Sequence, residues 1–296
     1  PSPILRTLVS GRECGAYGLD RGRLWARAQL WIAAAVLSAA PGAAEVRDAT
    51  PLREALHAVD LRGHVEEWPE LTLVVRDRAR LELDPEAFAA LEREVHGAFA
   101  PSALAAQVES GLQESLSAGR VAVVLSHFEG PGAALRAAER AALLPADLNE
   151  QPVFLAGIPV RPPSKTRRDW LRRLDAATQR TDNVMAVALG VSLAMARGLH
   201  ALRCGTGESR AALEAQASRS VLRHRNDVAM RLRAAGLFAY RDLSLGAIAE
   251  HTRFLESEDG RAFLGALHAE LERALESADG EARAALAPQI ASGCSR

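Results

Sequence analysis

The sequence has few aromatic residues and hardly any lysine. Aromatic side chains make up 4% of its 296 residues, and Lys165 is the only lysine among many arginines and alanines. Strands favour aromatic and β-branched residues, whereas alanine is the best helix former, so this composition favours closely packed helices over a β-sandwich. Together with helical spacing of apolar residues along the chain, it predicts an all-α protein, a multi-helix bundle.

Strong charge of either sign is also missing. The formal net charge is −1, and the chain stays mildly acidic when the first 44 residues are set aside. Domains that bind nucleic acid usually carry a strongly basic surface. We therefore expect no nucleic-acid partner.

Motifs that carry common chemistry are absent. The eight histidines form no HExxH pattern, no CxxC pair is present, and no GxSxG elbow indicates a serine hydrolase. The sequence predicts no metal site and no cofactor, and it indicates no particular reaction.

The N-terminal region has the three parts of a secretory signal peptide. Three arginines at positions 21, 23 and 27 precede the apolar segment Ala28–Ala40, and the small residues Gly42 and Ala44 follow. The segment is shorter than the roughly 20 apolar residues that span a bilayer. We expect cleavage near Gly42 or Ala44 and a periplasmic product, with residues 1–20 as an upstream extension. An uncleaved anchor at Ala28–Ala40 and a buried N-terminal helix are the alternatives.

Export bears on the cysteines. Cys14 would leave with the leader, which leaves Cys204 and Cys294. In an oxidising compartment these two residues are a candidate disulfide, and two free thiols are the alternative.

Apolar periodicity divides the rest of the chain into two helical halves, 45–150 and 164–277. Asp84 and Ser117 are predicted helix N-caps. Four prolines within 151–163 predict an irregular linker, and residues 278–296 are predicted to be a polar tail. The predicted helices cover residues 51–59, 85–99, 101–112, 117–128, 135–144, 164–203, 208–238 and 242–275.

The two halves share a weak repeat. Leu-Ser-x-Gly begins at Leu116 and again at Leu243, 127 residues later, and a glutamate follows each at Glu129 and Glu256. Packed about a pseudo-twofold axis, these two acids would be candidates for a general acid/base pair. The alternative is that each acid is solvated at a helix end or accepts a hydrogen bond from the neighbouring backbone.

Basic residues are concentrated after the predicted linker. They form a candidate patch for anionic lipid or an acidic partner, although such runs are often solvated helix faces. The patch comprises Arg161, Lys165, Arg167, Arg168, Arg172 and Arg173.

The second copy of the repeat contains the sequence FLESEDGRAF, in which Phe254, Ser257, Gly260 and Phe263 follow the spacing F-x-x-S-x-x-G-x-x-F. With the preceding Asp-Leu-Ser, this resembles the exported bacterial proteins grouped as domain of unknown function 2059. The resemblance covers residues 50–275, and it implies a helical envelope protein with a structural rather than catalytic motif.

Three functions follow as expectations. The first is a non-catalytic binding or interaction module of the bacterial cell envelope, whose partner is an envelope protein or a small ligand. The second is a periplasmic hydrolase or lyase that uses Glu129 and Glu256. The third is a membrane-surface protein that uses the basic patch.

Overall fold

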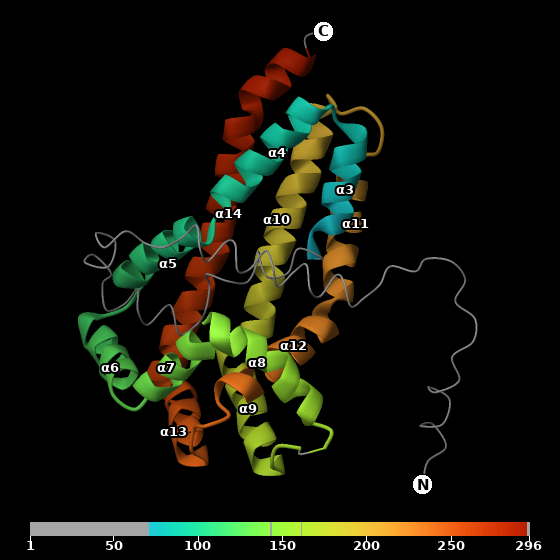
Figure 1. Ribbon diagram of the computed structural model, residues 1–296. Helices are drawn as coiled ribbons and strands as arrows, with labels where there is room; N and C mark the ends of the chain where they lie inside the picture. The colour runs from blue at the N-terminus through green and yellow to red at the C-terminus, as the bar shows by residue number, and fades with distance from the viewer. Residues whose placement is uncertain (1–70, 143, 161, 295–296) are drawn as a thin grey trace. The chain divides into compact units, whose positions relative to one another are not determined.

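The computed structural model (Figure 1) describes residues 71–294 except residues 143 and 161. In this part of the chain the regular secondary structure consists of helices and no strand, which confirms the predicted all-α class. The predicted leader, the predicted helix at 51–59 and Arg161 lie outside the described residues.

Two helices in the first part of the described chain begin at the N-caps that the sequence predicts. The Asp84 carboxylate accepts hydrogen bonds from the backbone N–H groups of Glu86 and Ala87, and the Ser117 hydroxyl accepts one from Arg120. These bonds satisfy N–H groups that have no partner within the helix. The helices of this region are α3 (Leu73–Glu82), α4 (Pro85–Ala98), α5 (Pro101–Ser115), α6 (Ala118–Glu129) and α7 (Ala133–Ala142).

The predicted linker is wrong in its first part, because residues 151–157 belong to helix α8 (Pro145–Gly157). Pro145 lies in the first turn, where no N–H is needed, and only Pro152 removes a hydrogen bond from the helix interior. The aromatic rings of Phe154 and Phe238 pack edge to face at 5.5 Å and attach α8 to the bundle. Non-helical backbone follows at residues 158–160 and 162–164.

The predicted helices 164–203 and 208–238 are each divided into two. The stretch 164–203 breaks at Gln179, which adopts a left-handed conformation with φ 49°, and the stretch 208–238 breaks at His224. The left-handed residues Cys204 and Gly205 end α10. The resulting helices are α9 (Lys165–Thr178), α10 (Arg180–Leu202), α11 (Arg210–Arg223) and α12 (Arg225–Ala239).

The predicted polar tail is also wrong. After α13 (Leu245–Leu255), the 37-residue helix α14 (Glu258–Cys294) continues through residues 278–294. Its buried face extends beyond Ala274 through Ala278, Ala282 and Leu286 at helical spacing. Since most of these residues are alanines, the apolar stripe is narrow and the segment appears polar in sequence.

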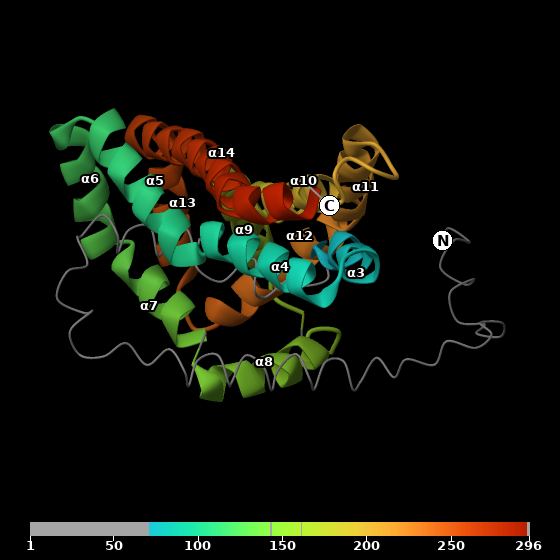
Figure 2. The same cartoon turned by 90° about the horizontal axis from the view of Figure 1, so that it is seen from above.

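Helices α10 and α14 run side by side through the bundle, and Figures 1 and 2 show the other helices arranged around them. Close approach is needed where Gly198 of α10 faces Leu91 of α4 and Leu286 of α14. A Cβ atom at Gly198 would lie 2.3 Å from Leu91 Cδ1 and 3.2 Å from Leu286 Cδ1. The main core runs from Val75 to Leu286, so the two predicted halves share one core.

Helix α10 is long and apolar enough to cross a membrane by length and composition alone. In the structure, however, 61% of its most apolar window is buried by neighbouring helices. An apolar helix that is mostly buried by its neighbours is typical of the core of a helical bundle.

The turn between α13 and α14 holds the F-x-x-S-x-x-G-x-x-F segment. The Ser257 hydroxyl donates to the Phe254 carbonyl at 2.6 Å and accepts from the Gly260 N–H at 3.2 Å. A Cβ atom on Gly260 would lie 2.1 Å from the Phe254 carbonyl oxygen and 2.6 Å from Leu255 Cα. The segment therefore fixes a tight helix–helix corner, with the side chain of Phe263 fully buried beneath it.

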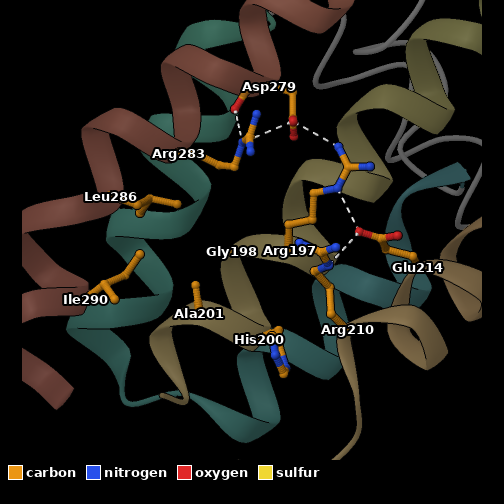
Figure 3. Close-up of a pocket in the computed structure, with 10 residues that line it drawn as sticks. All are labelled: Arg197, Gly198, His200, Ala201, Arg210, Glu214, Asp279, Arg283, Leu286 and Ile290. Carbon is orange, nitrogen blue, oxygen red and sulfur yellow. Dashed lines mark hydrogen bonds and ion pairs between the residues drawn. The ribbon is translucent and has the colours of Figure 1, made fainter. Parts of the chain in front are cut away.

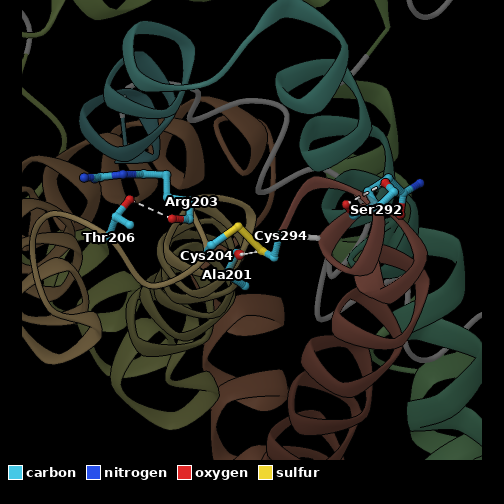
Figure 4. Close-up of a disulfide and its surroundings, with 7 residues drawn as sticks. Ala201, Arg203, Cys204, Thr206, Ser292 and Cys294 are labelled. Atoms are coloured by element: carbon cyan, nitrogen blue, oxygen red, sulfur yellow. Dashed lines mark hydrogen bonds between the residues drawn. A yellow bond between two sulfur atoms is a disulfide. The ribbon is translucent and has the colours of Figure 1, made fainter. Parts of the chain in front are cut away.

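Cys204 and Cys294 form a disulfide, with their Cα atoms 5.4 Å apart (Figure 4). It joins the loop after α10 to the last residue of α14 and closes a loop of 90 residues. The C-terminal end of α14 is thereby tied to the C-terminal end of α10.

We predict that Gly260→Ala lowers the free energy of unfolding by about 1–3 kcal/mol, because the new methyl group meets backbone atoms that have no room to move. Gly265→Ala, in the same helix, is the matched control, since a Cβ there has no neighbour within 4 Å. It should raise stability by up to about 1 kcal/mol. Urea unfolding curves measure both effects, and equal stabilities for the two variants would contradict the tight corner.

We predict that loss of the disulfide lowers the free energy of unfolding by about 4–5 kcal/mol in the chain-entropy model. The double variant Cys204→Ser/Cys294→Ser and the wild-type protein in reductant should unfold at the same, lower denaturant concentration. Alkylation of both Cys204 and Cys294 in wild-type protein kept without reductant would show that the bridge is not formed. A midpoint that reductant does not change would show the same.

Candidate functional site

The two repeat glutamates have separate surroundings. Glu129 is exposed at the end of α6, whereas both carboxylate oxygens of Glu256 accept hydrogen bonds from the Arg173 guanidinium. No hydrogen bond joins the two described carboxylates to each other. The carboxylate of Glu256 is thus engaged in a bidentate ion pair with Arg173, directly after the last turn of α13.

The predicted basic patch is mostly engaged within the chain. Arg167 donates to the backbone carbonyls of Tyr240 and Leu243, Arg172 pairs with Asp169, and Arg173 pairs with Glu256. Lys165 and Arg168 are exposed. Arg167 therefore links α9 to the loop between α12 and α13, and Arg173 links it to the end of α13, whereas the Arg172–Asp169 pair lies within α9.

The repeat brings together aromatic rings and histidines instead of carboxylates. Phe254, which lies 127 residues after His127, stacks on its ring at a centroid distance of 3.7 Å. His127 Nε2 and His251 Nδ1 are 2.9 Å apart and share a buried hydrogen bond. Ser117 and Ser244, also 127 residues apart, cap α6 and α13. Two equivalent positions of the repeat, His127 and Phe254, are therefore in contact within a buried cluster of histidine and phenylalanine rings.

A pocket with a volume of about 510 Å³ lies between α10, α11 and α14 (Figure 3). Charged side chains line one part of it and aliphatic side chains line the other. The lining residues are Arg197, Gly198, His200, Ala201, Arg210, Glu214, Asp279, Arg283, Leu286 and Ile290.

The charged part of the pocket is an ion-pair network across three helices. Arg197 of α10 donates to Glu214 of α11 at 2.8 Å and contacts Asp279 of α14 at 2.9 Å. Each carboxylate has a second guanidinium nearby, Arg210 at 3.6 Å from Glu214 and Arg283 at 3.2 Å from Asp279. The network thus contains three guanidinium groups and two carboxylates.

Arg197 stays charged at any physiological pH. Burial by itself lowers the pKa of Arg197, but hydrogen bonds to Glu214 and Asp279 raise the pKa above its ordinary value. Because Arg197 lies between two acids from different helices, it fixes the positions of α11 and α14 relative to α10.

Sequence reasoning misses this pocket for a physical reason. The pairs Arg210/Glu214 and Asp279/Arg283 are visible as neighbours at helical spacing. Their meeting across helices depends on α14 continuing past residue 277, in a segment predicted to be a tail.

The chain matches no protein-family model, no curated protein and no solved structure. Among the described residues, no group of three or more His, Cys, Asp or Glu side chains is placed to hold a metal ion.

We predict that stability falls as the pH drops from about 6.5 towards 4. Burial lowers the pKa of His127 to about 4, and burial, followed by the charges of His127 and Arg136, lowers the pKa of His251 to about 3. Since unfolded histidines bind protons near pH 6.5, the unfolded state gains protons first as the pH falls. Each histidine contributes a slope of at most about 1.4 kcal/mol per pH unit.

Urea unfolding between pH 5 and 7 measures this slope. The variant His127→Gln/His251→Gln should flatten it, whereas His96→Gln, at an exposed position, should leave it unchanged. An equal slope in the wild type and the double variant would contradict the assignment to the buried pair.

Proposed function

We propose that this protein is a non-catalytic binding protein of the bacterial cell envelope, and that it holds a small ligand between α10, α11 and α14. The observation that carries the proposal is the pocket of about 510 Å³. Small-molecule sites in proteins typically occupy 300–1,000 Å³ and combine an apolar lining with a few fixed polar groups. This pocket has both features.

The arrangement of its charges favours binding over catalysis. The acids Glu214 and Asp279 already accept hydrogen bonds or ion pairs from arginines. A general base needs a carboxylate that is available to take a proton from the substrate. Guanidinium groups, which do not exchange protons in this pH range, are the groups that face a ligand.

Placement in the envelope is supported by three features. The leader pattern at 21–44 is typical of a secretory signal, the disulfide is typical of an oxidising compartment, and the segment Phe254–Phe263 resembles exported envelope proteins. Each feature has an independent physical or sequence basis.

A ligand-observed NMR screen tests the proposal. The panel contains small anionic, neutral and cationic compounds, each tested against the wild type and Ala201→Phe, which fills the pocket. At least one compound should bind the wild type and lose binding in Ala201→Phe. Ala285→Phe, at an exposed position of α14 that does not line the pocket, is the control and should bind normally. A panel with no binder, or binding that survives Ala201→Phe, would contradict the proposal.

A further inference from the structure

We propose, on the basis of the binding function above, that the ligand is a monocarboxylate with a flexible aliphatic chain. The carboxylate would lie between Arg210 and Arg283, and the chain would extend along Ala201, Leu286 and Ile290. Charge, hydrogen-bonding capacity and the apolar lining each support this class.

The charge of the network selects a single anion. Three arginines face two carboxylates, so the network carries a net charge of +1 even though each arginine contacts an acid. A ligand with one negative charge balances it. Cationic ligands would meet net repulsion, and a dianion would exceed the available charge.

Two of the arginines present their guanidinium groups to the pocket. The side chains of Arg210 and Arg283 are 67% and 62% exposed, and the closest contact of each to its acid is made through Nε. Arg197 is only 30% exposed and lies between Glu214 and Asp279. The outer N–H groups of Arg210 and Arg283 are not the atoms that make these closest contacts, and a planar, two-oxygen acceptor such as a carboxylate matches their geometry.

The other part of the pocket offers contacts without hydrogen bonds. Gly198, Ala201, Leu286 and Ile290 line it, and Figure 3 shows them beside one another on α10 and α14, with His200 at the lower rim. No aromatic ring other than the His200 imidazole lines the pocket, so it has little surface for stacking a flat ligand. An aliphatic chain gains the full benefit of such a surface because it needs no polar partner.

Zwitterions and sugars fit less well. An ammonium group needs a free acidic acceptor, and both carboxylates of the pocket already have two guanidinium neighbours. A sugar carries many hydroxyl groups, and the aliphatic part has no acceptors for them. The chemistry of the walls thus matches an amphiphile with one carboxylate.

Isothermal titration calorimetry with decanoate and decanol, which have the same chain and differ in charge, tests the head group. Decanoate should bind at least tenfold more tightly than decanol. Arg210→Gln and Arg283→Gln should each weaken decanoate binding several-fold and leave decanol binding unchanged. Arg219→Gln is the control, because Arg219 is exposed on the same helix as Arg210 and does not line the pocket.

Chain length tests the apolar part. Each methylene buried between hexanoate and decanoate should tighten binding about fourfold, which corresponds to about 0.8 kcal/mol per CH₂. The increments should vanish in Ala201→Phe.

Each other outcome has one meaning. If decanol binds as tightly as decanoate, if the arginine variants bind decanoate normally, or if decyl phosphate binds more tightly, the monocarboxylate class is wrong and the binding function stands. The same holds if another compound of the NMR panel occupies the pocket and decanoate does not. If no compound occupies the pocket, both proposals fail.

Discussion

The close contact between α10 and α14 is the constraint on which the rest of the structure depends. At Gly198 the absence of a side chain lets Leu91 and Leu286 approach the α10 backbone. The last third of α14 can then pack as a helix instead of fraying. Its buried face is made largely of alanines, so it is stabilised by close van der Waals packing of the helices and less by burial of a large apolar area.

Three linkages hold this helix in place, each at a different point along it. The Gly260 corner fixes its start, Arg197 links Asp279 in its middle to α10 and α11, and the disulfide at Cys294 fixes its end. The pocket is a consequence of this arrangement. Its charged part arises where the ion pairs hold the three helices, and its aliphatic part lies between those ion pairs and the disulfide.

Local signals predict much of the fold, whereas long-range signals are missing from one sequence. Asp84 and Ser117 cap helices through short-range hydrogen bonds, which depend on residue type and spacing alone. The break at Gln179 depends on a left-handed conformation that nothing in its side chain demands. The pocket could not be predicted because it is formed by α10, α11 and the end of α14. That last segment looks polar in sequence, since its buried face consists mainly of alanines. The repeat does mark spatial neighbours, but they are His127 and Phe254 rather than the two glutamates.

The continuity of α14 is the central claim, and hydrogen–deuterium exchange measures it most directly. The structure predicts that the backbone amides from Ala278 to Leu286 in the oxidised protein exchange slowly, at rates similar to those between Phe263 and Ala274. Rapid exchange from Ala278 onwards, with protection only before it, would mean that the segment is a loose tail. The pocket wall formed by Asp279, Arg283 and Leu286 would then not exist, and both binding proposals would lose their structural basis.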